Sequence, residues 1–109
     1  MANKKVNSAA STNATLLQAG PSAVTSIFLT NNTAGTKYLK LYDKATAPVP
    51  GTDVPIATFG IPPNGLVLNF PDITVCAALG LGYAITGAPA DLDTTATAVN
   101  DVTGLIQYR

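Results

Sequence analysis

The stretch that decides the fold is Thr36–Tyr42, TKYLKLY, because its aliphatic residues occupy alternate positions. Successive side chains of a β-strand point to opposite faces, so Leu39 and Leu41 share one face. The residues of the opposite face are Tyr38, Lys40 and Tyr42. This two-residue period is typical of a strand that packs on a core with one face. We expect the second face, an aromatic and basic stripe, to point toward solvent or another subunit.

The rest of the chain repeats this organisation. Short apolar runs are separated by Gly, Pro, Asn and Asp at intervals of roughly 8–12 residues, as in sandwiches and barrels. The one helical alternative, Asp91–Val99, contains three threonines and is a poor helix. The expected strands are Ala14–Ala19, Ala23–Thr30, Thr36–Tyr42, Val54–Ile61, Leu66–Phe70, Ile73–Leu79, Leu81–Thr86 and Val102–Tyr108. We therefore predict an all-β, antiparallel β-sandwich or barrel of about eight short strands.

The predicted core consists of apolar residues that share a face within these strands. Its members are Leu16, Ile27, Leu29, Leu39, Leu41, Ile56, Leu66, Leu68, Val75, Tyr83, Ile85, Val102 and Ile106. One strand is ambiguous, because Val24 and Phe28 are out of phase with the aliphatic residues around them. This strand is either buried on both faces or contains a β-bulge.

Residues 1–13 are small and polar and show no periodicity. We expect them to form a flexible N-terminal arm that is disordered or lies along another subunit, followed by a single β-sandwich or barrel domain over residues 14–109. Lys4 and Lys5 are not followed by the apolar run that a secretory signal needs. No stretch approaches the roughly 20 apolar residues of a membrane span, so we expect synthesis in the cytoplasm and no membrane partner.

The composition points to association rather than to long-range electrostatic attraction. Only 11% of the residues are charged, and six Lys/Arg balance six Asp, which gives a net charge of zero. A binder of nucleic acid or anionic membrane would need an excess of positive charge, so we expect neither partner. Neutral proteins associate more readily than charged ones, which favours a subunit of a larger assembly.

The residues that most often carry catalysis are missing. The chain has no His and no Glu, so general acid–base chemistry near neutral pH has few candidates, and we expect no enzyme. The single cysteine, Cys76, can form no internal disulfide, and we expect it to be a buried, inert strand residue. No Cys/His cluster or nucleotide-binding motif is present, so no cofactor is expected.

Asp91 and Asp93 have a spacing that can place two carboxylates on one cation, and Asn100 and Asp101 are possible further ligands. These are weak metal candidates, because the loop lacks the glycine and the distal Glu of a calcium loop. We favour turn-forming aspartates that accept hydrogen bonds from nearby backbone amides. Together with the tyrosine stripe, this loop leaves a glycan- or surface-binding module as an alternative function.

Three segments resemble small virion proteins of tailed bacteriophages and together span more than half of the chain. They are Lys37–Pro55 (KYLKLYDKATAPVPGTDVP), Phe59–Leu68 (FGIPPNGLVL) and Leu81–Tyr108 (LGYAITGAPADLDTTATAVNDVTGLIQY). The resemblance implies a capsid decoration (cement) protein that binds the outer shell, or else a neck, tail or fibre accessory protein.

On this resemblance the partners would be the major capsid protein or other virion subunits, the chain would form a homo-oligomer, with a trimer favoured, and its location would be the virion. The resemblance identifies no contact residues. From the arm and the stripe themselves, the interface candidates are Lys4, Lys5, Val6, Tyr38, Lys40 and Tyr42.

Overall fold

A computed structural model describes residues 1–65 and 67–109, with side chains outside residues 66–74. It contains eight strands: β1 (Ala2–Asn7), β2 (Thr15–Ala19), β3 (Ser22–Asn31), β4 (Lys37–Asp43), β5 (Ala57–Ile61), β6 (Val67–Ala77), β7 (Gly80–Thr86) and β8 (Val102–Tyr108). All strand pairs are antiparallel, and no described residue is helical. The prediction of an all-β, antiparallel fold is therefore confirmed.

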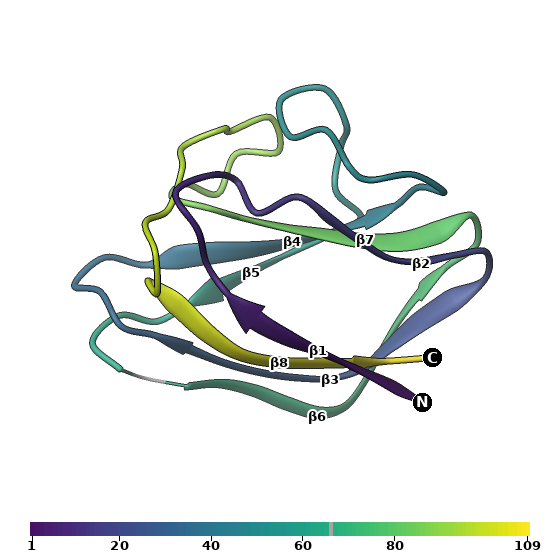
Figure 1. Ribbon diagram of the computed structural model, residues 1–109, viewed down its shortest axis with the longest axis horizontal. Helices are drawn as coiled ribbons and strands as arrows, with labels where there is room; N and C mark the ends of the chain where they lie inside the picture. The colour runs from purple at the N-terminus through teal and green to yellow at the C-terminus, as the bar shows by residue number, and fades with distance from the viewer. Residues whose placement is uncertain (66) are drawn as a thin grey trace.

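The strands form two four-stranded sheets that pack face to face (Figure 1). Sheet I has the order β1-β8-β3-β6, and sheet II has the order β2-β7-β4-β5. Four of the strand pairs are those of one long hairpin, in which β1 to β4 run antiparallel to β5 to β8. These pairs are β1·β8, β2·β7, β3·β6 and β4·β5. The additional pairs β8·β3 and β7·β4 join this hairpin into two sheets. The resulting topology is that of an eight-stranded jelly-roll sandwich.

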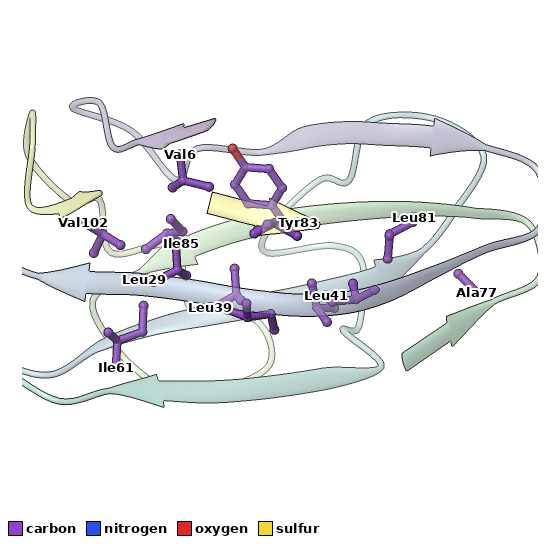
Figure 2. Close-up of a cluster of buried hydrophobic side chains, with 13 residues drawn as sticks. Val6, Leu29, Leu39, Leu41, Ile61, Ala77, Leu81, Tyr83, Ile85 and Val102 are labelled. Carbon is purple, nitrogen blue, oxygen red and sulfur yellow. The ribbon is translucent and has the colours of Figure 1, made fainter. Parts of the chain in front are cut away.

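The space between the sheets is filled by aliphatic side chains and one tyrosine (Figure 2). The predicted core residues found in this cluster are Ile27, Leu29, Leu39, Leu41, Tyr83, Ile85, Val102 and Ile106, and Val75 packs against it while partly exposed. Each fully buried Leu or Ile contributes about 1.5–3 kcal/mol relative to an exposed position. The cluster also includes five residues that we did not predict: Val6, Val24, Ile61, Ala77 and Leu81.

Two predicted core residues lie elsewhere. Ile56 is 46% exposed, because β5 places Ala57 opposite Leu41 and so directs Ile56 to the other face. Leu16 is only partly buried, and Leu17 packs on the core instead, since the register of β2 shifts between Leu16 and Gln18. The predicted core positions Leu66 and Leu68 lie outside the described side chains.

The structure joins two of the predicted strands and decides between the alternatives for a third. The segments expected as two strands around Pro71 belong to the single strand β6. β6 is an edge strand of sheet I, and only one side of an edge strand takes part in the hydrogen bonds of the sheet. Pro71, which lacks a backbone N–H, is therefore tolerated in this strand. Of the two alternatives for the Ala23–Thr30 segment, the structure shows the bulge, because the register of β3 shifts between Val24 and Ser26 on both of its neighbours.

The N-terminal arm is the largest correction to the sequence interpretation. Residues 2–7 form β1, which pairs along its whole length with β8, and Val6 is only 1% exposed. The following residues are also held in place: Ser8 Oγ donates to Ala98 O at 2.7 Å, and Asn13 Nδ2 donates to Thr97 Oγ1 at 2.8 Å. One valine among polar residues gives no periodic signal, so the distant partner β8 could not be predicted.

Candidate interaction surface

Over β7 and part of β4, the outer face of sheet II is covered by the chain itself. The loops of residues 44–56 and 87–101 both lie on this side of the sandwich (Figure 1). All seven residues of β7 are buried. A Cβ atom on Gly82 would lie 2.8 Å from Pro48 Cδ, and one on Gly51 would lie 2.8 Å from Thr94 Cγ2. The first loop therefore rests directly on β7 and also meets the second loop.

This cover buries most of the predicted Tyr38, Lys40 and Tyr42 stripe. The three residues do share the face opposite to Leu39 and Leu41, but Lys40 is 0% and Tyr42 1% exposed, while Tyr38 is partly exposed. The prediction that Lys40 and Tyr42 face solvent or another subunit is therefore wrong. Alternation reveals which residues share a face, but it does not reveal that a loop from a distant part of the chain covers that face.

Lys40 holds the second loop on the sheet. Its ammonium donates a hydrogen bond to Ala90 O at 2.5 Å. Burial lowers the pKa of Lys40, because the charged form loses hydration, and the nearby carboxylates of Asp93 and Asp91 oppose this effect. The hydrogen bond and these nearby carboxylates attach residues 87–101 to β4.

The aspartates proposed as weak metal ligands have local structural roles. Asp93 accepts hydrogen bonds from Thr95 N at 3.0 Å and Thr95 Oγ1 at 2.8 Å. Burial opposes ionisation of Asp93, but these hydrogen bonds and the charge of Lys40 outweigh it, so its pKa is lowered. Asp101 accepts from Ala98 N at 2.8 Å. Within the described part of the chain, no group of three His, Cys, Asp or Glu residues could hold a metal ion.

A small pocket of about 230 Å³ lies beneath the first loop. It is lined by Tyr42, Asp43, Lys44, Asp53 and Val54. Its charged groups already have partners, because Lys44 Nζ donates to Asp53 Oδ2 at 2.7 Å and Asp43 accepts from three backbone amides of residues 78–80. These amides lower the pKa of Asp43. The volume is below the roughly 300–1,000 Å³ of ligand pockets, so these contacts mainly anchor the loop and the β6–β7 turn.

Cys76 is exposed, which corrects the prediction of a buried cysteine. It lies near the end of β6, opposite Ala23 of β3. The apolar run around it suggested burial, but β6 is an edge strand, and the residues on either side of Cys76 face inward: Ala77 is in the core cluster and Val75 packs against it.

The outer face of sheet I contrasts with that of sheet II, because both long loops lie on the opposite side of the molecule (Figure 1). The cross-strand register aligns three rows of outward-facing residues over β1, β8 and β3. The rows are Asn7–Thr103–Thr30, Lys5–Leu105–Phe28 and Asn3–Gln107–Ser26. Over these three strands the face thus has a partly exposed Leu105–Phe28 centre, an uncharged polar surround in which Ser26 is buried, and one charge, Lys5.

The predicted interface residues of the N-terminus divide among different environments. Val6 is part of the core, whereas Lys5 is exposed and Lys4 partly exposed. Both lysines line a groove of about 450 Å³ between β1 and the start of β2. The other lining residues are Asn7, Ala9, Ser11, Asn13, Ala14, Thr15 and Tyr83. Burial raises the pKa of Tyr83, and a hydrogen bond with Thr15 opposes this rise.

Comparison with protein-family models, curated proteins and solved structures gave no significant match. None of the described residues forms a helix long and apolar enough to cross a membrane.

Proposed function

We propose that the chain is a structural component of a bacteriophage particle, a capsid decoration protein that binds the outer shell and stabilises it. The observation that carries the proposal is the outer face of sheet I over β1, β8 and β3, whose three aligned rows contain one charged residue, Lys5. The resemblance of three segments to small virion proteins supports the same role. An enzyme is not proposed, because the chain has neither His nor Glu with which to build an acid–base site.

The exposed face has the anatomy of a protein-binding surface. The centres of interfaces are depleted of charged residues and enriched in aromatic ones, and their rims are polar. Phe28 and Leu105 are cross-strand neighbours at the centre, and Thr30 and Thr103 are neighbours in the adjacent row. Covering such a face would bury few ionic groups, because Lys5 alone among the aligned residues of β1, β8 and β3 would need an acidic partner or a place on the rim.

The alternatives are a neck, tail or fibre accessory protein and a glycan-binding module. Jelly-roll sandwiches occur in viral capsid proteins and in lectins, so topology alone does not separate these functions. Burial of Tyr42 weakens the glycan hypothesis, because its ring is covered by the first loop and cannot stack on a sugar. A glycan array probed with and without calcium would support that alternative if binding were lost on changing Tyr38.

Mass spectrometry of purified particles tests the proposal. We expect hundreds of copies per particle for a shell protein, whereas a handful would indicate the neck, tail tip or fibre, and absence would refute the virion role. The surface itself is tested by adding purified variants to particles that lack the protein. Thr103→Arg in the exposed face should abolish binding, whereas Val54→Arg, at a 64% exposed loop position over the other sheet, should not. Equal urea midpoints would show that both variants fold.

A further inference from the structure

The inference concerns the open edge of β1. Among the described residues, β1 pairs only with β8, so its other edge has no strand beside it. Ser8 N donates to Val102 O at 2.9 Å, which continues the β1·β8 ladder in register. Antiparallel strands bond to a given neighbour through alternate residues. Even-numbered residues of β1 therefore bond to β8, and Asn3, Lys5 and Asn7 direct their backbone N–H and C=O groups to the open edge.

β8 gives an independent check of this assignment. Arg109 N donates to Ala23 O at 2.9 Å, and Ala23 N donates to Arg109 O. Odd-numbered residues at this end of β8 thus bond to β3, which leaves the even-numbered residues for β1. The same parity follows from the Ser8–Val102 bond at the opposite end of the strand. A six-residue edge of about 20 Å is therefore available for pairing.

The groove beside this edge is cationic and polar. Lys4 and Lys5 are its only charged lining residues, and amide and hydroxyl side chains make up most of the remainder. The two lysines occupy opposite faces of β1, because Val6 points into the core and side chains alternate along a strand. A strand added to the edge would therefore meet a positive charge on each of its faces.

The charges decide which occupant fits. A second copy pairing antiparallel through β1 in a register centred on Lys4 or Lys5 would place that lysine directly opposite its symmetry mate, and like charges directly opposite each other destabilise a strand pair. Lysines on an edge strand act in this way to prevent self-pairing. A strand with acidic side chains would instead gain cross-strand ion pairs at both faces.

We propose that β1 accepts an extended, acidic peptide segment of a partner protein as an additional strand of sheet I, by β-augmentation. Backbone hydrogen bonds to Asn3, Lys5 and Asn7 provide the pairing, and Lys4 and Lys5 select acidic side chains. That the segment belongs to a shell subunit rests on the proposed function. The recognition chemistry itself depends only on this edge and its groove.

The test uses the full chain and two synthetic peptides. The first is acetyl-Thr-Val-Thr-Asp-Asp-Val-Thr-amide, whose adjacent aspartates lie on opposite faces of an extended strand, and the second is its counterpart with Lys in place of Asp. The backbone amide chemical shifts of the protein are followed by NMR while each peptide is added. We expect the acidic peptide to shift residues 2–7 and the groove, and to bind more weakly as salt is raised from 0.05 to 0.5 M. The basic peptide should not bind.

Two substitutions at one position separate backbone pairing from charge. Lys5→Pro removes an N–H that faces the open edge and is not used in the fold, so affinity should fall roughly tenfold or more. Lys5→Gln keeps the N–H and should weaken binding about threefold. Lys37→Gln, the same charge change at a distant position, should have no effect.

Equal affinities for Lys5→Pro and Lys5→Gln, or no binding of the acidic peptide by the unaltered chain, would overturn the inference. Either result would leave the particle-binding experiment above unaffected. Absence of the chain from particles, combined with peptide binding at β1, would instead refute the phage role and retain the edge as a peptide site.

Discussion

Gly104, at the centre of β8, is the position where one added methyl group should disturb sheet I most. Its φ is +146°, a conformation that residues with side chains rarely adopt. A Cβ atom would collide with the carbonyl oxygen of Phe28 and lie 2.9 Å from Leu29 Cα. Both neighbours belong to the backbone of β3, so no side chain can rotate away to make room.

We expect Gly104→Ala to lower the free energy of unfolding by about 2–6 kcal/mol. Backbone strain accounts for about 1–3 kcal/mol, and overpacking against β3 accounts for about another 1–3 kcal/mol. This is a large part of the roughly 5–15 kcal/mol that stabilises an ordinary domain. The matched control is Gly35→Ala, since a Cβ there meets nothing within 4 Å and the φ of Gly35 is not positive.

Urea unfolding followed by circular dichroism measures both variants. The Gly104→Ala midpoint should fall well below that of the unaltered chain, with a similar slope, whereas Gly35→Ala should change stability by no more than about 0.5 kcal/mol. Equal midpoints for the two variants would show that β8 does not approach β3 as described. The arrangement of the exposed face would then be wrong as well.

Three further predictions concern the loops and the edge of sheet I. Lys40→Glu should lower the free energy of unfolding by about 3–5 kcal/mol, because it buries an unpaired negative charge near Asp91 and Asp93. Lys40→Met should lower it by about 1 kcal/mol. If urea unfolding shows that Lys40→Glu leaves the stability unchanged, the burial of this lysine is contradicted. The folded-state pKa of Asp43 is lowered, so its contribution to stability is complete above the ordinary carboxyl pKa and is lost as pH falls through the folded value. Asp43→Asn should therefore reduce the loss of stability below about pH 4, and an unchanged pH profile would count against this role. Cys76 should react completely with a water-soluble disulfide reagent in the folded protein, and protection until unfolding would contradict its exposure.

Much of the fold could be predicted from local patterns. The alternation in Thr36–Tyr42 identified β4 and showed which of its residues share a face, and the conflicting phases of Val24 and Ile27 made a bulge in β3 one of two alternatives. These features depend on residues close together in sequence. The pairing of β1 with β8, at opposite ends of the chain, depends on backbone hydrogen bonds that side-chain periodicity does not encode.

The exposed surfaces were harder to predict, because exposure depends on what else covers a sheet. Lys40 and Tyr42 have the composition of a solvent-facing stripe, yet residues 44–56 and 87–101 cover them. Phe28 and Leu105 resemble core residues, yet they lie on the outer face of sheet I. The alternation of the Val102–Tyr108 segment already placed Leu105 opposite to Val102 and Ile106. Only the position of the two long loops, however, shows that the sheet face that contains Leu105 is not covered by them.

Electron cryomicroscopy of the intact particle tests the central claim most directly. The account predicts density for the chain over the outer shell, with the Phe28–Leu105 face of sheet I turned toward shell subunits and the loops over sheet II turned away. Density in which the loops contact the shell while sheet I remains uncovered would contradict the proposed docking surface, and particles with no density for the chain would contradict the virion role.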